Sequence, residues 1–357
     1  MSKLWNPIKV GNMELKHRLA MSPMTRSRAY ENGVPNDLTA EYYSQRASLG
    51  LIITEGTQPS DDGQGYMNSP GIYRQEHIDG WKKVIDKVHD NGAYIFIQLM
   101  HAGRISHPDN TPHHRQAVAP SAITPDANMH TAEGSKPIPE PRELSVDEIQ
   151  DIIEEFKHAA TSAIEAGADG VELHGANGYL IQQFISKNSN HRTDEYGGSI
   201  DNRIKFAIEV AQAVAEEIGS EKVGFRISPG VELNGIDEGD KEHDIHPTYV
   251  KLVEELNKLD LAYIHVMHFG DDELLPKIRK AWNNTLLVNR FGRPMENLAN
   301  DIDNGLSDIS PIGQWALANP DIVERIKNDY PLNEMDPTTI YGGGEKGYID
   351  YPYYGNK

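Results

Sequence analysis

The sequence predicts a single domain over residues 1–357 with the α/β fold of a (β/α)₈ barrel, or TIM barrel. Three observations support this prediction. A chain of 357 residues has the length of one barrel with insertions. Eight short apolar runs, partly β-branched, recur along the chain, and helical or loop segments separate them. Strands that alternate with helices pair in parallel, and eight of them favour a closed barrel over an open sheet.

The predicted strands are short and spread over most of the chain. In chain order they are residues 19–21, 51–54, 94–99, 170–173, 222–227, 262–266, 285–288 and 308–310. No linker and no internal repeat beyond the strand–helix alternation interrupts this series. We therefore place no domain boundary.

Two of the connecting helices carry strong signals. Ser145 and Glu148 form the S-x-x-E pattern of a capping box, and apolar residues then follow at helical spacing until Gly167. A second helix is predicted over about residues 202–218, with an apolar face of Ile204, Ile208, Ala211 and Val214. Both helices should lie outside the barrel.

Residues 100–142 follow the third predicted strand and differ from the rest of the chain. They hold seven prolines and five histidines and show no sustained periodicity. Such a stretch is typical of a long excursion rather than of a regular element. In a barrel an excursion at this place overhangs the active-site mouth, so we expect a lid or a binding loop.

The charge of the chain argues against several kinds of partner. Its formal net charge is −20, with 54 acidic and 34 basic residues, which would repel nucleic acid and anionic membrane surfaces. No apolar run approaches the length of a membrane-spanning helix, and the first residues, MSKLWNPIKV, lack the pattern of an export signal. A cytoplasmic location is the expectation.

The chain has no cysteine, so any redox chemistry must reside in a bound cofactor. The histidines at 101, 107, 113 and 114 invite interpretation as a metal site, but their spacing matches no familiar zinc pattern. A solvated loop explains them with fewer assumptions, and no metal is predicted.

Polar residues stand where the predicted strands end, and barrel enzymes place their chemistry at those ends. Gln98 and Arg226 lie within otherwise apolar strands, where burial is costly unless a ligand or partner satisfies them. The polar segments 22–26, 55–57 and 174–179 follow the first, second and fourth strands. A polar, planar ligand lying across the mouth would satisfy these groups together.

The chain resembles the Old Yellow Enzyme family from end to end. The motifs that carry the resemblance occur in family order over about 350 residues: SPMTRSRA, EGTQ, IQLMHAGRISH, HGANGYLIQQF, RTDEYGGS, RISPG, LANPD and YGGGEKGYIDYP. The resemblance implies a (β/α)₈ barrel that binds FMN. It also implies that hydride passes from NADPH or NADH to an enone-like acceptor by ping-pong kinetics.

The resemblance also implies how the flavin ring is held. Thr25 would donate a hydrogen bond to the C4 carbonyl, with Pro23 and Met24 beside it. Gly56 would let the ring approach the backbone, and Gln98 would bind its pyrimidine edge. Arg226 would lie near N1 and the C2 carbonyl, where a guanidinium favours the negative charge of the reduced ring.

For catalysis, the resemblance assigns the cluster after the fourth strand. His174 and Asn177 would donate hydrogen bonds to the acceptor's carbonyl or nitro oxygen, and Tyr179 would protonate its α-carbon as a general acid. Tyr66, Met100 and Tyr341 would line the substrate pocket together with His174 and Asn177.

Three positions depart from the family pattern. Most relatives have tryptophan in place of Met100, and a flexible thioether should enlarge or soften the pocket. Many relatives have an arginine for the flavin phosphate where this chain has Gln314. The end of strand 7 reads NRFGR instead of a small, glycine-rich turn, and we hypothesise that one of its arginines supplies the lost charge. Backbone amides around Gly292 and Gly313 would complete the phosphate site, and the residues of this region expected to bind the cofactor are Asn289, Arg290, Gly292, Arg293, Gly313 and Gln314.

Each of these residues also has a plain structural interpretation. Thr25 could be a turn residue, Gln98 a polar residue that fills the barrel, and Arg226 half of a buried ion pair. The occurrence of these polar residues together at five strand ends favours the functional interpretation. A dienoyl-CoA reductase-like activity fits less well, because the large members of that branch carry an iron–sulfur cluster and a second dinucleotide domain. A non-catalytic flavin- or phosphate-binding barrel would not need a proton donor, and the sequence leaves monomer and homodimer open.

Overall fold

The computed structural model describes residues 2–355, and its centre is one eight-stranded parallel sheet. In sheet order the strands are β14 (Ser310–Ile312), β3 (Leu19–Met21), β4 (Leu51–Ile53), β5 (Tyr94–Leu99), β10 (Gly170–Gly175), β11 (Val223–Ile227), β12 (Tyr263–His268) and β13 (Thr285–Arg290). A parallel bridge between Leu287 and Ile309 brings β13 back to β14 and closes the barrel. The predicted fold class is confirmed.

All eight predicted strands are present, and only their ends differ. β10, β12 and β13 each run two residues further toward the mouth than predicted. β14 begins at Ser310, because Asp308 and Ile309 donate their backbone amides to Leu286 of β13 instead. The longer strands carry polar residues such as His268 and Arg290 to the rim of the mouth.

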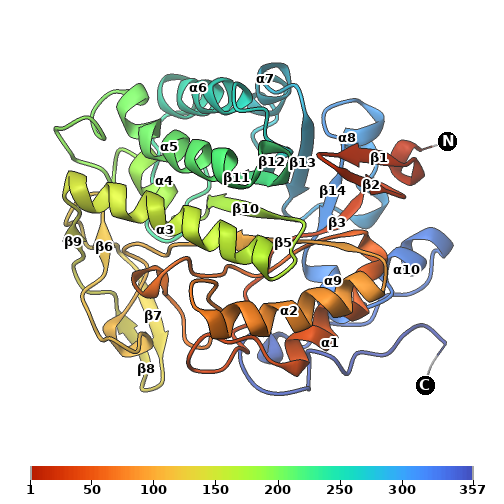
Figure 1. The fold of residues 1–357 in the computed structure, drawn as a ribbon. Helices are drawn as coiled ribbons and strands as arrows, with labels where there is room; N and C mark the ends of the chain where they lie inside the picture. Colours follow the sequence, from red (N-terminus) through yellow and green to blue (C-terminus); the bar gives the residue numbers. More distant parts are fainter. Residues whose placement is uncertain (1, 356–357) are drawn as a thin grey trace.

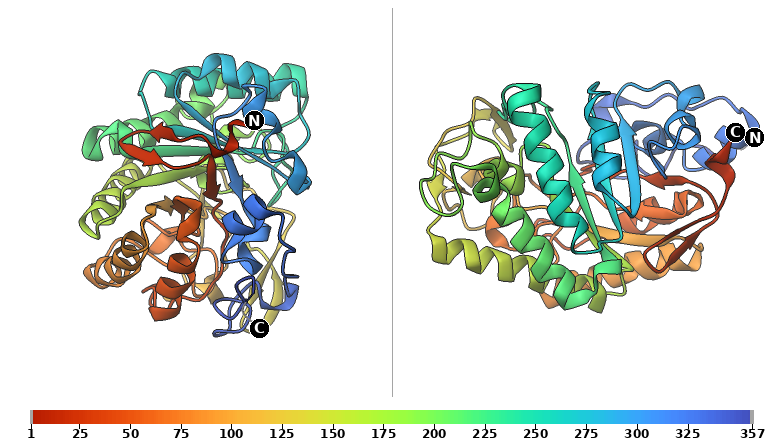
Figure 2. Two further views of the ribbon diagram at one scale, coloured as in Figure 1. Left: turned by 90° about the vertical axis from the view of Figure 1, so that its right-hand side faces the viewer. Right: turned by 90° about the horizontal axis from the view of Figure 1, so that it is seen from above.

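Helices surround the barrel, and Figure 1 shows α2, α3, α5, α6 and α7 arranged around the sheet. Around the barrel the sequence colours follow one another from red through green to blue, so consecutive strand–helix units are neighbours (Figure 2, left). The helices are α1 (Asp37–Gln45), α2 (Gln75–Asp90), α3 (Val146–Glu165), α4 (Leu180–Ile185), α5 (Ile200–Ile218), α6 (His246–Asn257), α7 (Leu274–Ala281), α8 (Asn300–Asp303), α9 (Gln314–Ala318) and α10 (Ile322–Asn328).

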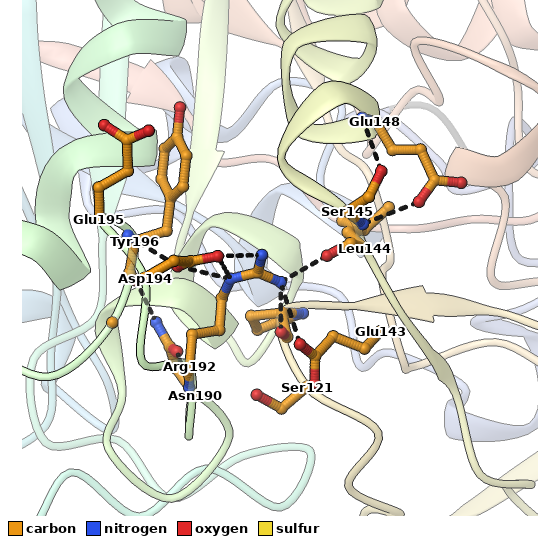
Figure 3. Close-up of polar contacts among 12 residues, drawn as sticks. Ser121, Glu143, Leu144, Ser145, Glu148, Asn190, Arg192, Asp194, Glu195 and Tyr196 are labelled. Carbon is orange, nitrogen blue, oxygen red and sulfur yellow. Dashed lines mark hydrogen bonds and ion pairs between the residues drawn. The ribbon is translucent and has the colours of Figure 1, made fainter.

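The capping box at the start of α3 is confirmed. The Ser145 hydroxyl accepts a hydrogen bond from the Glu148 amide at 3.2 Å, and the Glu148 carboxylate accepts one from the Ser145 amide at 2.8 Å (Figure 3). The apolar stripe then turns Ile149, Ile152 and Phe156 into the core. In residues 2–355 no helix combines the length and apolar character needed to cross a membrane.

A hairpin at the N-terminus, absent from the sequence prediction, covers the N-terminal end of the barrel (red in Figure 1). It comprises β1 (Ile8–Val10) and β2 (Met13–Leu15), which pair antiparallel. Val10, Met13 and Leu15 are buried in one cluster with barrel residues including Phe96 and Leu287. The barrel is therefore plugged at this end, and its C-terminal mouth is left for a ligand.

The excursion after β5 contains more regular structure than predicted. β7 (Asn128–Thr131) and β8 (Gly134–Pro137) form an antiparallel hairpin, while β6 (Val118–Ala119) pairs with β9 (Arg142–Glu143). Strands of two to four residues are too short for a periodic signal. Met129 and Ile138, on and beside the hairpin, pack with Met100 and Tyr179, so the excursion does reach the mouth as predicted.

The RTDEYGGS motif ties the excursion to the barrel. The Arg192 guanidinium donates hydrogen bonds to the carbonyls of Pro120 at 2.9 Å and Leu144 at 2.6 Å, on either side of the hairpin. Asp194 pairs with the same guanidinium at 2.5 Å (Figure 3). This motif therefore holds together the two segments that flank the hairpin.

Candidate functional site

Arg226 lies near the mouth end of β11 and is 5% exposed. Its Nε atom has no hydrogen-bond partner among residues 2–355. Burial lowers the pKa of the guanidinium, while the negative charge of Glu172 acts in the opposite direction. A buried guanidinium nitrogen without a partner is costly, so this group is a strong candidate for a ligand contact.

The neighbouring end of β10 presents two more unsatisfied atoms. His174 lies directly opposite Arg226 in the strand register, and its buried Nδ1 has no partner in the described chain. Burial and the nearby Arg226 charge hold the pKa of His174 well below its usual value, so the imidazole is neutral at neutral pH. The buried Oδ1 of Asn177 is also without a partner in this part of the protein.

Asn177 is held in an unusual backbone conformation. Its φ of +57° lies in the left-handed region, which non-glycine residues adopt infrequently. The Ser228 hydroxyl accepts a hydrogen bond from its amide at 2.8 Å, and the Asn234 amide donates to its carbonyl at 2.7 Å. The loop after β11 thus supports a side chain of the loop after β10, as expected for a residue positioned for function.

Tyr179 precedes α4 and faces the same space. Its ring meets that of His174 edge-to-face with centroids 5.0 Å apart, and its hydroxyl lies 2.9 Å from the hydroxyl of Tyr66. Burial first, and then the neighbouring Tyr66, hold the pKa of Tyr179 well above its usual value. The phenol therefore keeps its proton at neutral pH, and His174, Asn177, Tyr179 and Tyr66 are brought together as predicted.

Gln98 belongs to a buried network inside the barrel that the sequence analysis did not identify. Its Nε2 donates to Glu172 of β10 at 2.8 Å, and the other carboxylate oxygen of Glu172 lies 2.9 Å from Nδ1 of His265 on β12. Glu172 and His265 are fully buried. The sequence did contain a signal for Glu172 and His265. Both are polar residues within apolar strands, as are Gln98 and Arg226.

The ends of β3 and β4 meet through Glu55. Its carboxylate accepts hydrogen bonds from the backbone amides of Arg26 at 2.9 Å and Ser27 at 3.1 Å, which orders the loop that contains Pro23, Met24 and Thr25. A Cβ atom added at Gly56 would lie only 2.5 Å from the sulfur of Met100. Met100 therefore packs directly on the glycine backbone, where a larger residue would push it away.

A C-terminal strap brings Tyr341 to the same rim. Arg26 donates to the carbonyls of Ile340 and Gly347, both at 2.9 Å, and the Gly342 amide donates to the Arg26 carbonyl at 2.9 Å. Tyr341 is 68% exposed, and its hydroxyl helps to raise the pKa of Tyr179. Sequence analysis missed this role of Arg26, although the arginine lies within one of the quoted motifs.

The predicted phosphate-binding residues lie around the ends of β13 and β14, but most of their polar groups already have partners. Arg290 donates to Asp301 at 2.7 Å and to Asp272 at 2.5 Å, and Arg293 also pairs with Asp301. Two guanidinium charges thus face two carboxylate charges, and their sum is zero. Asn289 donates to the Ser22 hydroxyl at 2.5 Å.

The two glycines of this group have free space around them. No atom lies within 4 Å of a Cβ added at Gly292, and at Gly313 the nearest atom, the sulfur of Met24, is 3.6 Å away. Gln314 is exposed. Backbone at this rim is therefore more accessible than the two arginine side chains.

The histidines of the excursion take part in local contacts. His101 Nδ1 accepts a hydrogen bond from the Gly103 amide at 3.1 Å, and His107 Nδ1 accepts one from the Asp109 amide at 3.1 Å. His113 Nε2 lies 3.1 Å from the Asp61 carbonyl, and His114 Nδ1 lies 2.8 Å from the Pro108 carbonyl. Within residues 2–355 no three histidine or acidic side chains gather as metal ligands would.

A cavity at the opposite end of the barrel lacks these features. It has a volume of about 680 Å³ and is lined by residues beside the N-terminal hairpin, including Gly11, Glu221 and Arg279. Its arginine is already satisfied, because Arg279 donates to Asp308 at 2.7 Å. The unsatisfied polar atoms of β10 and β11 favour the C-terminal mouth as the functional site.

Comparisons with known proteins find relatives that span nearly the whole chain. The model of the NADH:flavin oxidoreductase / NADH oxidase family matches residues 3–333. A protein of Leishmania infantum described as a probable flavin mononucleotide-dependent alkene reductase is 41% identical, over 97% of this chain and 96% of its own. The 12-oxophytodienoate reductase 1 of Oryza sativa subsp. japonica is 40% identical, over 98% and 93%. The structure of morphinone reductase in complex with tetrahydroNAD superimposes with a TM-score of 0.93 at 38% identity, covering 99% and 98%.

Proposed function

The chain belongs to the Old Yellow Enzyme family of FMN-dependent NAD(P)H oxidoreductases, and on this premise we propose that it reduces the carbon–carbon double bond of α,β-unsaturated carbonyl compounds. One observation carries the proposal. The buried Nδ1 of His174 and the buried Oδ1 of Asn177 have no partner in the described residues, and the protonated hydroxyl of Tyr179 stands beside His174. An imidazole N–H of His174 and the Nδ2 amide of Asn177 can donate to an acceptor's oxygen, whereas Oδ1 can only accept. Reduction of such an acceptor requires two polar groups that bind its carbonyl oxygen and one proton donor.

The residues at the mouth fit FMN. The unpartnered guanidinium nitrogen of Arg226 is suited to an electron-rich edge of the ring, and the Gln98 amide is held in place by its hydrogen bond to Glu172. Thr25, Gly56, Gln98 and Arg226 would hold the ring, with Pro23 and Met24 at its side. When bound, FMN takes hydride from the nicotinamide and passes it to the acceptor.

The protein's own groups then handle the acceptor. His174 and Asn177 would donate hydrogen bonds to its carbonyl oxygen, and the lowered pKa of His174 keeps the imidazole a neutral donor. Tyr179 would deliver a proton to the α-carbon, because its raised pKa keeps that proton in place until the carbon becomes basic. Tyr66, Met100 and Tyr341 would form the walls of the pocket. Because one site would serve both substrates in turn, we expect ping-pong kinetics.

A nitro compound or nitroester is the second candidate for the acceptor. A nitro oxygen can occupy the same position between His174 and Asn177. Reduction of a nitro group needs no proton on carbon, so this activity would depend less on Tyr179. The two acceptor classes can therefore be separated by one substitution at that tyrosine.

The phosphate of FMN would lie at the ends of β13 and β14. We propose that Arg290 and Arg293 contribute part of the charge that Gln314 does not supply, with backbone around Gly292 and Gly313 and the Asn289 and Gln314 amides completing the site. Asp301 and Asp272 compete for the same guanidinium groups, so the two arginines should contribute little to phosphate binding. Replacing both arginines with alanine should weaken FMN binding by less than about tenfold. Unchanged FMN affinity, measured by fluorescence titration of the apoprotein, would remove the two arginines from the phosphate site.

The proposed reaction is tested with the purified yellow protein under anaerobic conditions. NADPH or NADH should bleach its visible absorbance, and cyclohexenone should restore it at a rate that rises with enone concentration. A protein that NADPH or NADH bleaches, and that a nitroester but not cyclohexenone re-colours, would contradict alkene reduction and support the second candidate.

A further inference from the structure

Glu172 is a charged residue buried within the barrel, and the proposed reaction uses its hydrogen bond to Gln98 but not its charge. It lies in the middle of β10 and is 0% exposed. Its two carboxylate oxygens are bound by Gln98 on one side, at 2.8 Å, and by His265 on the other, at 2.9 Å. One carboxylate therefore links strands β5, β10 and β12 directly beneath the mouth.

The negative charge of Glu172 acts on Arg226. In the register of β10 and β11, Glu172 lies opposite Gly224 and His174 lies opposite Arg226, so the guanidinium stands nearer the mouth than the carboxylate. Glu172 raises the pKa of Arg226, and the pKa of Glu172 is lowered first by its contact with His265 and then by the charge of Arg226. Together the two side chains carry no net charge.

The contacts of Glu172 alone do not require a carboxylate. A glutamine at this position has an oxygen that could accept the Gln98 hydrogen bond and an amide that could donate to Nδ1 of a neutral His265. Burial lowers the pKa of His265, so this imidazole is neutral and does not balance the carboxylate. A buried charge costs free energy that a neutral amide would avoid. The negative charge itself therefore calls for an explanation.

We propose that Glu172 is a positioning residue that sets the reduction potential of the bound FMN by fixing the Gln98 amide and offsetting the positive charge of Arg226. The inference rests on the proposed function, which places Gln98 and Arg226 at the flavin ring. An unopposed Arg226 would favour the reduced, more negative flavin. That state would form easily from NAD(P)H but would pass hydride to an alkene less readily, so Glu172 balances the two half-reactions.

The substitution Glu172→Gln tests the role of the charge with the smallest change in shape. The affinity for reduced FMN relative to oxidised FMN should rise about tenfold, because a Coulomb interaction across a few ångströms of protein interior is lost. For a two-electron couple this equals an upward shift of about 30 mV in the midpoint potential, measured by equilibration with a reference dye. Reduction by NADPH should be as fast or faster, and reoxidation by cyclohexenone should be slower.

Two further variants separate charge from structure. Glu172→Asp keeps the charge and should return the potential to near that of the unaltered protein, even where FMN affinity falls. Glu238→Gln makes the same chemical change at another buried carboxylate, which binds Tyr249 at 2.6 Å and acts on Arg203 rather than Arg226. Glu238→Gln should leave the potential unchanged. Equal shifts in the Glu172→Gln and Glu238→Gln proteins would overturn the proposal.

Arg226→Gln distinguishes failure of this inference from failure of the proposed function. It should lower the potential, and an unchanged value would show that Arg226 does not face the flavin at all. A shift in Arg226→Gln without one in Glu172→Gln would overturn the role of Glu172 alone. If Glu172→Gln does not retain FMN, the double variant Glu172→Gln/Arg226→Gln is compared with Arg226→Gln. A higher potential in the double variant supports the proposal, and an equal potential overturns it.

Discussion

The two sides of the barrel mouth satisfy their polar groups in opposite ways. On the side of β10 and β11, buried atoms of His174, Asn177 and Arg226 have no partner in the described structure. On the side of β13, the arginines at 290 and 293 are neutralised by two aspartates. The first side leaves buried polar groups free to bind a ligand, whereas the second satisfies most of its own charges. Under the proposed function, preformed side chains would hold the ring of FMN, and backbone would hold most of its phosphate.

The largest effect is expected at Tyr179, on the first side. Tyr179→Phe removes the proton donor but keeps the ring against His174, so enone reduction should fall about 1,000-fold. Reduction of the enzyme by NADPH should not change, because that half-reaction needs no proton from tyrosine. Stopped-flow measurement of the two half-reactions separates these effects. A loss of less than about tenfold would show that the proton comes from another group, and retained nitroester reduction would sharpen the distinction between acceptors.

Burial of a histidine near the mouth should also make the free energy of unfolding depend on pH. His101, at the end of β5, is buried, and desolvation lowers its pKa to about 4. In the unfolded chain this histidine takes up a proton near pH 6.5, whereas in the folded protein it does so only near pH 4. The unfolded state therefore binds more protons in this window, and His101 alone should lower the free energy of unfolding by about 3 kcal/mol as the pH drops from 6.5 to 4.

Urea unfolding of the FMN-loaded protein at several pH values checks this expectation. The variant His101→Gln removes the titrating group and should flatten that part of the pH dependence. His113→Gln is the matched control, since its imidazole also contacts backbone, at the Asp61 carbonyl, but is less buried. An equal dependence of the unfolding free energy on pH in the unaltered protein and both variants would show that His101 is not the source of that dependence.

The smallest effect is expected on the second side, where the chain departs from its relatives. Gln314→Arg restores the charge that many relatives carry, at an exposed position beside Gly313. One charge-assisted contact to phosphate should strengthen FMN binding about tenfold. Titration of the apoprotein with FMN measures this gain, and riboflavin, which lacks the phosphate, is the control ligand. An equal gain for riboflavin would place the phosphate elsewhere.

Elements that have strong local patterns could be predicted from the sequence. The eight strands were found because β-branched apolar runs have a clear signal, and the α3 capping box was found because Ser145 and Glu148 stand at the required spacing. The hairpins β1–β2 and β7–β8 were missed because their short strands mix exposed residues with buried or half-buried ones, whereas the equally short β3 and β4 are continuous apolar runs. Such elements depend on tertiary packing, here of Met129 and Val10 against distant residues.

The same limit applies to the candidate site. The cluster His174, Asn177 and Tyr179 was predicted from one contiguous motif, and the structure brings its members together. Glu172 and His265 lie 93 residues apart, and nothing local relates them. The pairing of Arg290 with Asp301 was also unforeseen, because it depends on how the loop after β13 folds back. Partners across the barrel become visible only when the strands are placed side by side.

The central claim is that the unpartnered groups of β10 and β11 face the flavin ring, and a crystal structure of the FMN-loaded protein tests it most directly. The account predicts a nitrogen of the Arg226 guanidinium about 3 Å from a nitrogen or oxygen atom of the ring, with the Gln98 amide at the same edge. A ring bound at the opposite end of the barrel, or one that leaves Arg226 without a contact, would contradict it.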